Sequence, residues 1–259
     1  MLLHSITDAR DGYDGVGITG SHGGMYAGWV AHRSRLRGAI FNDAGGGYRV
    51  NGVPAGVAGV VALATAGMAA AAVTHVSAEI GDARETLGGT IGTVNVLARA
   101  LGVRAGMTAR QAAQLLERAE RGEGAFPPVA EGASEWFGAA LLDSASLVAP
   151  QHRGRIVITG SHGGLVGGDA TRAIKVPVRL AVFNDAGVGR NGAGLARIRV
   201  LEERNIAAAA VAHTTAPIGE ARPMLDGRLA FVNAPAAALG LAIGSTLRDA
   251  LAPLMSDRS

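Results

Sequence analysis

Ile18-Thr-Gly-Ser-His-Gly-Gly24 occurs a second time, letter for letter, as Ile158-Thr-Gly-Ser-His-Gly-Gly164 in this chain of 259 residues. The segment Phe41-Asn-Asp-Ala-Gly45 likewise recurs at Phe183–Gly187. In each case a β-rich apolar run ends in polar residues and glycine, which is typical of a buried strand followed by a turn. Matched blocks in one order and at a nearly constant offset are not expected by chance, so we predict an internal duplication.

Three further blocks extend the match along both copies. They are Ala69–His75 with Ala207–His213, Ile80–Arg84 with Ile218–Arg222, and Val94-Asn95 with Val232-Asn233. The predicted first α/β repeat spans residues 1–118 and the second spans 141–259. The polar segment between them, residues 119–140, contains Gly and Pro and is predicted to be a linker.

Strand-like and helix-like segments alternate within each copy. The expected strands cover residues 15–19, 39–42 and 70–74 in the first copy and 155–159, 180–184 and 208–212 in the second. Helical spacing covers 108–118 and 193–204. Alternation of this kind predicts an α/β fold with mainly parallel sheets and helices packed on them. The duplication further predicts two half-domains related by a pseudo-twofold axis.

Composition and charge narrow the classes of partner. The chain carries 24 Lys and Arg against 21 Asp and Glu, a formal net charge of +3, but its arginines are scattered and Lys175 is its single lysine. We therefore expect no nucleic-acid partner and instead a small-molecule substrate that is anionic. With no apolar stretch of membrane length, we expect no membrane association and a cytoplasmic location. Glycine-rich α/β proteins of this size often associate, so a homo-oligomer is an open expectation.

Polar side chains follow each predicted strand in both copies. Because the carboxyl ends of parallel strands meet at one edge of a sheet, we expect these groups to converge on a crevice. Helix capping by Ser and Asp explains part of the pattern but not the retained histidines. The predicted catalytic residues are Ser21, His22, Asp43, His75, Ser161, His162, Asp185 and His213.

Serine chemistry is the leading interpretation of this set. Ser21 or Ser161, expected on a strand-to-helix turn, would be the nucleophile, His75 or His213 the base, and Asp43 or Asp185 the orienting carboxylate. The substrate-binding residues would be Gly23, Gly24, Asn42, Arg84, Asn95, Gly163, Gly164, Asn184, Arg222 and Asn233. The predicted function is a small-molecule hydrolase acting on an amide, lactam or ester of a small polar or anionic substrate.

Other classes of function stay open. The same groups could move protons in a cofactor-independent isomerase, racemase or lyase of a small carboxylic acid, or hold an anion without catalysis. Arg84 could clamp such an anion or simply pair with Asp82. His22, Asp43 and His75 could also hold a divalent metal, although their spacing matches no compact metal signature. We predict no cofactor, because the Gly-rich Gly187–Gly192 segment alone is a weak dinucleotide fingerprint.

Overall fold

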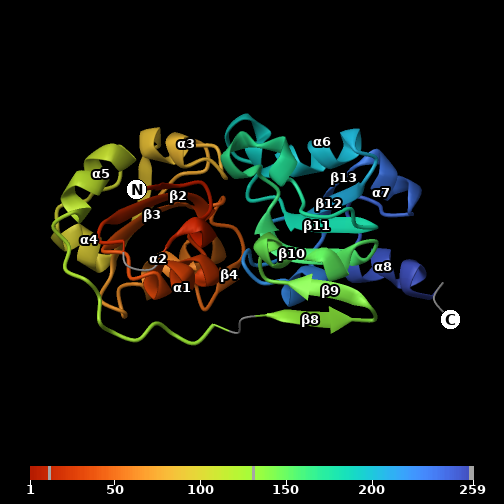
Figure 1. Cartoon of the computed structure of the whole chain (residues 1–259), viewed down its shortest axis with the longest axis horizontal. Helices are drawn as coiled ribbons and strands as arrows, with labels where there is room; N and C mark the ends of the chain where they lie inside the picture. The colour runs from red at the N-terminus through yellow and green to blue at the C-terminus, as the bar shows by residue number, and fades with distance from the viewer. Residues whose placement is uncertain (11–12, 130–131, 257–259) are drawn as a thin grey trace.

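The computed structural model of the chain describes residues 1–10, 13–129 and 132–256, which form two α/β lobes side by side (Figure 1). The first lobe contains a five-stranded sheet in the order β1-β2-β3-β6-β7. All neighbours in it are parallel except β6 and β7. Its strands are β1 (Leu2–Leu3), β2 (Val16–His22), β3 (Gly38–Asn42), β6 (Ala69–Val73) and β7 (Ile91–Val94).

The second lobe repeats this strand order and adds one strand at its edge. Its six-stranded sheet runs β13-β12-β11-β10-β9-β8, with parallel pairing from β9 to β12 and antiparallel pairing at both edges. The strands are β8 (Ala133–Trp136), β9 (Ala139–Leu142), β10 (Ile156–His162), β11 (Leu180–Asn184), β12 (Ala207–Val211) and β13 (Leu229–Val232). Strand β8 and the start of β9 fall within the predicted linker 119–140, so the end of that segment belongs to the second sheet.

Helices cover both faces of each sheet, which makes each lobe a three-layer unit. In the first lobe they are α1 (Met25–Arg33), α2 (Ala58–Ala62), α3 (Ala83–Gly88), α4 (Val96–Ala100) and α5 (Ala109–Leu116). In the second they are α6 (Ala196–Glu203), α7 (Ala234–Ala238) and α8 (Leu247–Ser256). None of the helices in the described part of the chain is long and apolar enough to cross a membrane.

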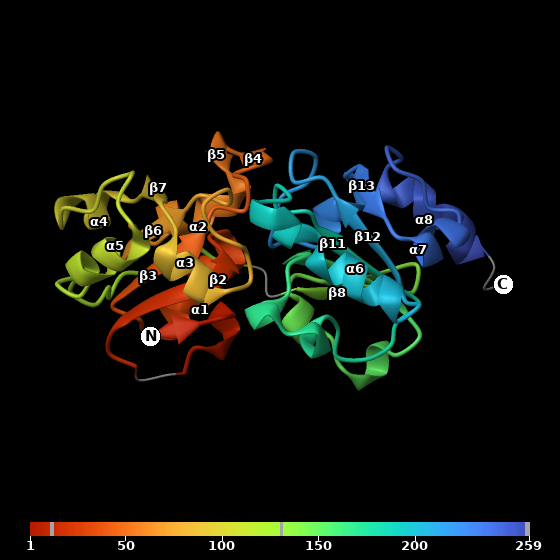
Figure 2. The same ribbon diagram turned by 90° about the horizontal axis from the view of Figure 1, so that it is seen from above.

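Short 3-10 turns and one hairpin complete the chain. The turns are η1 (Ile6–Asp8), η2 (Ala55–Val57), η3 (Ala145–Leu147), η4 (Pro150–His152), η5 (Val166–Gly168), η6 (Ala170–Arg172), η7 (Arg190–Leu195) and η8 (Arg222–Asp226). The hairpin pairs β4 (Arg49–Val50) with β5 (Val53–Pro54). In Figure 2 this hairpin stands over the boundary between the lobes, and next to it Tyr48 N–H donates to His213 O across that boundary (2.7 Å).

Alternate residues of the central strands enter different apolar clusters, as expected for a sheet with two covered faces. Phe41 packs with α1 and α2, whereas the neighbouring Ile40 packs with α4 and α5. Alanine fills most of β6 and β12, where the strands are buried on both sides. The predicted mainly parallel α/β architecture is therefore confirmed.

The two lobes differ after the repeated Gly-Ser-His-Gly-Gly segment. Helix α1 follows β2, and its Gly28 lies so close to Gly59 of α2 that a β-carbon on Gly28 would come within 2.8 Å of the Gly59 Cα. The position that matches Gly59 in the second lobe is Arg197, which leaves no room for such a helix. The chain there forms η5 and η6 instead, with Gly167 and Gly168 at φ of 67° and 71°. After the repeated Gly-Ser-His-Gly-Gly segment, the predicted strand–turn–helix pattern is therefore found only in the first lobe, whereas the helix predicted over 193–204 of the second copy is present as α6.

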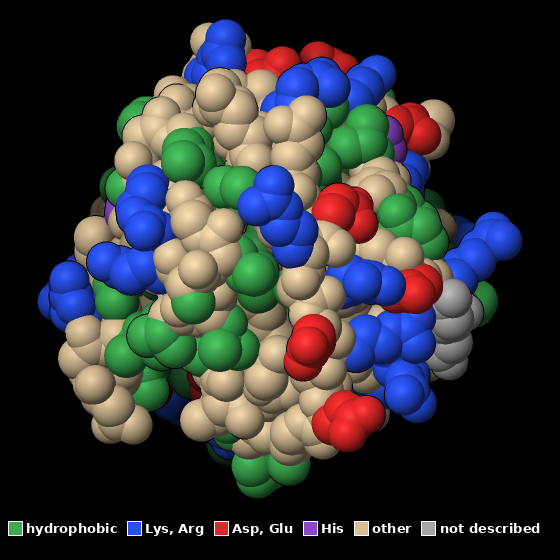
Figure 3. Space-filling view, turned by 90° about the vertical axis from the view of Figure 1, so that its left-hand side faces the viewer, with side chains coloured by type: hydrophobic (Ala, Val, Ile, Leu, Met, Phe, Trp, Pro, Cys, Tyr) green, Lys and Arg blue, Asp and Glu red, His purple; other side chains and the backbone are tan. Residues whose placement is uncertain are grey.

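Charged side chains are dispersed on the face of the first lobe that points away from the second. Figure 3 shows arginines alternating there with aspartates and glutamates, and no continuous basic surface. In the first lobe Asp14 pairs with both Arg37 (2.7 Å) and Arg121 (3.2 Å).

Candidate functional site between the lobes

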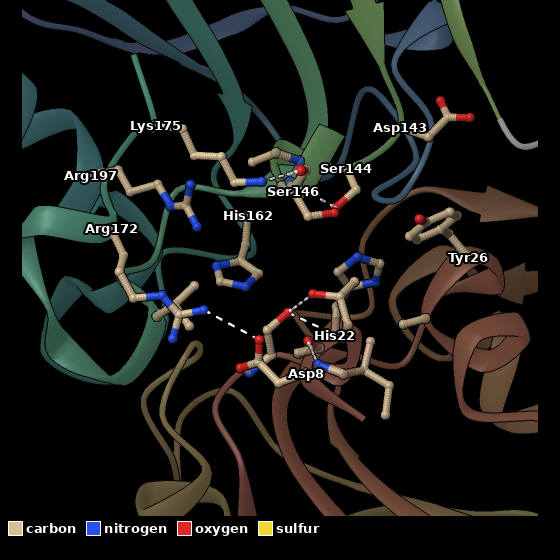
Figure 4. A pocket seen from close by; sticks show the side chains of 18 of the residues that line it. Asp8, His22, Tyr26, Asp143, Ser144, Ser146, His162, Arg172, Lys175 and Arg197 are labelled. Atoms are coloured by element: carbon tan, nitrogen blue, oxygen red, sulfur yellow. Dashed lines mark hydrogen bonds and ion pairs between the residues drawn. The ribbon is translucent and has the colours of Figure 1, made fainter. Parts of the chain in front are cut away.

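A cavity of about 530 Å³ lies between the lobes, where the ends of β2 and β10 face each other (Figure 4). Both strands lose register with their neighbours just before they end, between Ile18 and His22 and between Ile158 and His162. Such bulges redirect side chains and are common beside functional sites. Here the irregular part of each strand includes its Ser-His pair, and both pairs lie in the cavity wall. The lining includes Asp8, Ser21, His22, Tyr26, Asp143, Ser146, Ser161, His162, Arg172, Lys175 and Arg197.

His22 and His162 form the centre of this site. Their ring centroids are 6.5 Å apart and the ring planes are inclined by 80°. Each side chain is about 6% exposed, and each ring is held at Nδ1, which accepts a hydrogen bond from Gly24 N–H or Gly164 N–H (3.1 Å each). Because Nδ1 accepts, the proton of a neutral ring is on Nε2. The repeated His-Gly-Gly sequence thus holds the two imidazoles in one tautomer, with Nε2–H free to donate.

Burial sets the charge of both imidazoles. Removal from water lowers the pKa of His22 to about 4. Burial first, and then the nearby charges of Arg197 and His22, lower the pKa of His162 well below its ordinary value. Both rings are therefore neutral at neutral pH, because desolvation penalises the charged form. A neutral imidazole with Nε2–H is a hydrogen-bond donor in this site and not a base.

Glycines of the opposite lobe close the space behind each ring. A β-carbon on Gly219 would lie 3.2 Å from Cε1 of His22, and one on Gly81 would lie 3.4 Å from Cε1 of His162. Both glycines have positive φ, 94° and 95°, which side chains rarely adopt. Gly167 N–H also donates to Gly81 O across the lobe boundary (2.8 Å). The matched Ile-Gly blocks of the sequence are therefore interface elements, a role that their pattern alone did not reveal.

The two repeated serines lie beside the histidines in the cavity. Ser21 Oγ accepts a hydrogen bond from Ile6 N–H (2.9 Å), and Ser161 Oγ accepts one from Ala145 N–H (2.8 Å). Both serines belong to the ends of β2 and β10 and not to the following turns, contrary to the position expected from the sequence. Each hydroxyl is thus held as an acceptor and keeps its own proton available to a ligand.

The cations of the cavity come from the second lobe. Arg197 is buried, donates to Gly164 O (2.8 Å) and Ala173 O (3.0 Å), and lies over the Phe183 ring. Burial, and next the charge of Arg172, lower the pKa of Arg197 to about 10, so its guanidinium stays charged at neutral pH. Figure 4 shows Arg197, Arg172 and Lys175 on the same side of the histidine pair.

The remaining two cations of this wall have partners at the rim. Lys175 Nζ donates to Ser146 O (2.5 Å), and Arg172 lies 3.4 Å from Asp8 of the first lobe. Sequence reasoning did not select any of the three cations. The one available signal was that the chain's single lysine stands in the segment where the two copies diverge.

The other predicted catalytic residues form two Asp–His pairs outside this cavity. Asp43 Oδ1 lies 3.0 Å from His75 Nδ1 and accepts from His75 N–H (2.8 Å). Asp185 and His213 repeat both contacts at 2.8 and 2.9 Å. The Asp185 carboxylate raises the pKa of His213, and the charge of Asp43 in the other lobe adds to this effect. No hydrogen bond or ion pair in the described chain joins Ser21 to either pair.

These Asp–His pairs lie where the glycine turns of the two lobes meet. The Cα of Gly187 would be 2.9 Å from a β-carbon on Gly45, and His213 Cδ2 would be equally close. Gly187 has the corresponding approach to His75, at 3.1 Å. The signature predicted as one crevice is therefore divided between a Ser-His cavity and an Asp-His contact between lobes.

The predicted binding residues take several positions. Asn42 and Asn184 hold the backbone through Ala44 N–H and Ala186 N–H, while Asn95 and Asn233 cap α4 and α7. Arg84 pairs with Asp82 (2.6 Å) and lies outside the cavity lining, and Arg222 lines a second cavity described below. Gly24 and Gly164 bind the histidine rings, and Gly23 and Gly163 donate to the carbonyls of Asn42 and Asn184 (2.9 Å each).

The residues predicted as metal ligands do not form one site. Within the described residues no group of three or more His, Asp or Glu side chains is arranged to hold a metal ion. His22 lies in the cavity while Asp43 and His75 bond to each other elsewhere, so the predicted metal set is not brought together.

Searches against protein-family models, curated proteins and solved structures find no match to this chain.

Proposed function

We propose that the chain is a small-molecule hydrolase that binds an anionic substrate between its lobes and cleaves an amide, lactam or ester bond. The observation that carries the proposal is the buried pair of neutral imidazoles, which present Nε2–H from both lobes to one cavity. Acyl transfer requires fixed donors where negative charge develops on the carbonyl oxygen. Two donors already held in place by backbone N–H groups meet this requirement.

In this proposal Arg197 and Lys175 bind the anionic group of the substrate. Arg197 is fixed by two backbone carbonyls, so it is pre-organised and loses little freedom on binding. Its burial strengthens the attraction to an anion because few water molecules compete. Lys175, at the rim, adds a second positive charge, and its contact with Ser146 O leaves further N–H donors.

Ser21 is the proposed nucleophile, and a difference between the lobes supports it over Ser161. Both serines accept a backbone N–H from the turn that precedes them. In the first lobe this turn ends at Asp8, a carboxylate that lines the cavity, whereas the matching position in the second lobe is Leu147. Asp8 is the proposed acceptor of the Ser21 proton as the hydroxyl attacks the carbonyl carbon, and the oxyanion formed accepts from His22 and His162.

The two lobes are proposed to descend from one duplicated unit and to be related by a pseudo-twofold axis. Reciprocal contacts support this relation. Tyr48 N–H donates to His213 O, and Arg190 N–H donates to His75 O (2.9 Å). The paired strand orders and the paired histidine contacts follow the same scheme. One shared cavity is what such a relation would place on the axis.

Proton transfer in an isomerase or lyase of a small carboxylic acid is the second candidate. The specific observation in its favour is again the low pKa of His22, because a neutral imidazole can polarise a carbonyl and stabilise an enolate. The two candidates differ in covalent chemistry. A serine hydrolase passes through an acyl-enzyme, whereas an enolising enzyme forms no bond to Ser21.

A pair of matched variants tests the proposal. We expect Ser21→Ala to reduce turnover of a panel of small carboxylate-bearing amides, lactams and esters by at least about 10³-fold. Ser161→Ala, which removes the equivalent hydroxyl, should alter mainly KM. The assay is turnover together with mass spectrometry for an acyl adduct at Ser21. Equal kcat for both variants and no adduct would refute the nucleophile. Anion binding with no turnover of any panel member would favour a non-catalytic module.

A further inference from the structure

The cavity has opposite charges at its two sides. Figure 4 places Arg172, Lys175 and Arg197 on one side of the histidine pair and Asp143 with Tyr26 on the other. Arg197 and both histidines are nine-tenths or more buried, yet none of their polar atoms is a buried atom without a partner. Polar atoms of these side chains that have no hydrogen-bond partner, such as Nε2 of His22, are therefore accessible from the cavity. A ligand is expected to cover them.

Asp143 lies at the boundary between this cavity and a second one of about 500 Å³. The second cavity shares Tyr26 and Asp143 with the first and is lined further by Glu220, Arg222 and apolar residues such as Met25 and Ile218. Burial raises the pKa of Asp143. Burial, and then the charge of Asp143, raise the pKa of Glu220. Asp143 accepts a hydrogen bond from Ala221 N–H (2.8 Å), but no ion pair in the described chain joins a cation to either carboxylate.

The first lobe has an ion pair at the positions that match Asp143 and Glu220. His4 corresponds to Asp143 and Asp82 corresponds to Glu220, so the first lobe contains an ion pair of opposite charges (3.3 Å). Arg84 completes the neutralisation of Asp82 (2.6 Å). Arg222, which matches Arg84, lines the second cavity but forms no ion pair with Asp143 or Glu220 among the described residues. The ion pair of the first lobe is therefore not repeated, and the Asp143 side of the first cavity has no lining cation.

From this juxtaposition we propose that the substrate is a zwitterion, with its carboxylate at Arg197 and Lys175 and a protonated amine at Asp143. The proposal rests on the proposed function and specifies its substrate class as an amide, lactam or ester that also carries a free carboxylate and a free amine, as some amino-acid derivatives do. The histidine pair lies between the two charged ends, so a carbonyl in the middle of such a molecule lies beside the imidazole donors. The apolar part of the second cavity provides space for a substituent near the amine.

Binding of a ladder of simple ligands tests the proposal without any need for turnover. Straight-chain ω-amino acids, from 3-aminopropanoate to 7-aminoheptanoate, are compared by calorimetry with the unsubstituted monocarboxylates of the same chain length. Each matched pair differs in the amine alone. We expect the best-fitting amino acid to bind about tenfold or more tightly than its monocarboxylate, as a charged hydrogen bond provides.

The variant Asp143→Asn identifies the group that binds the amine. Asparagine retains an oxygen that can accept the hydrogen bond from Ala221 N–H (2.8 Å), so the local backbone keeps its partner. We expect the preference for the amino acid to disappear while the affinity for the monocarboxylate stays the same. Asp226→Asn removes a carboxylate that pairs with Arg248 outside the cavity, and it should leave both affinities unchanged.

The outcomes separate this proposal from the one beneath it. If every monocarboxylate binds as tightly as its amino acid, the zwitterion is refuted while an anion-binding site remains. If the preference survives Asp143→Asn, the amine is held elsewhere and the assignment is overturned. If no ligand of the ladder binds, the anionic site of the proposed function fails, and the zwitterion fails with it.

Discussion

The buried imidazole of His22 makes the stability of the protein depend on pH in a direction that can be calculated. Its pKa falls from an ordinary 6.5 to about 4 in the folded chain. The unfolded state therefore binds a proton between these two values and the folded state does not. Stability from this group is complete above about pH 6.5, decreases as pH falls, and is lost below about pH 4. At about 1.4 kcal/mol per pH unit, the full loss is about 3 kcal/mol.

The perturbation that tests this calculation is His22→Asn. Asparagine does not titrate, and its side-chain oxygen can accept the Gly24 N–H bond now accepted by Nδ1. Urea unfolding at a series of pH values between 7.5 and 4 gives the free energy of unfolding of both proteins. We expect the wild-type curve to fall more than the variant curve, with a difference of about 3 kcal/mol accumulated at the acid end. His162→Asn should reduce the slope in the same direction.

The same experiment can refute the reasoning. His213 has a raised pKa and contributes with the opposite sign, since its stabilisation is present at low pH and lost as pH rises through that pKa. Its contribution is common to the wild type and His22→Asn, so it cancels in the difference between them. Parallel curves for the two proteins would mean that His22 is protonated as readily in the folded state as in the unfolded state. The imidazole would then not be the neutral donor on which the proposed chemistry depends.

Two further perturbations address the contacts between lobes. Gly219→Ala places a β-carbon 3.2 Å from His22 Cε1 at a φ of 94°, whereas the control Gly240→Ala has a similar φ of 91° and no atom within 4 Å. Each substitution should lower the free energy of unfolding by about 1 kcal/mol through backbone strain. Only Gly219→Ala should lower it further and weaken carboxylate binding. Thermal unfolding and calorimetry measure both, and equal losses would show that the ring does not depend on this close approach. Asp185→Asn removes the main cause of the raised pKa of His213, so an NMR titration should show that pKa falling toward its ordinary value, and an unchanged titration would exclude the Asp185 contact as its cause.

The strands could be predicted from the sequence because their apolar, β-rich pattern agrees with their buried position in the sheet. Runs such as Leu180–Asn184 are apolar, β-rich and closed by polar residues and glycine, and they form the buried centre of the sheet. The segment after His162 was predicted less well. In the first lobe Gly59 leaves space for the helix that follows β2, whereas the matching residue of the second lobe is Arg197, whose side chain leaves no such space. That dependence is a packing effect between segments far apart in the chain. Periodicity within one segment does not contain it.

The sequence selected some of the residues that line the candidate cavity but not their grouping. Sequence comparison of the two copies selected Ser21, His22, Ser161 and His162, and these four residues line one cavity. The same comparison selected Asp43 and His75 with equal weight, although they bond to each other elsewhere. Retention in both copies does not distinguish a residue that faces a ligand from one that faces the other lobe. The cations occur in the second copy only, so a comparison of the two copies does not select them.

In the proposed site, the absence of a helix after β10 would affect how a ligand is oriented. Two donors contributed alike by two similar sheets would, by themselves, accept a molecule equally well in either of two orientations. The second lobe opens where the first has α1, and the space carries Arg197, Arg172 and Lys175 on one side of the pair. With the ligand we propose, this difference would favour one of the two orientations, and the two faces of its carbonyl group would have different surroundings. The proposed hydrolase would then be expected to discriminate between stereoisomers of its substrate.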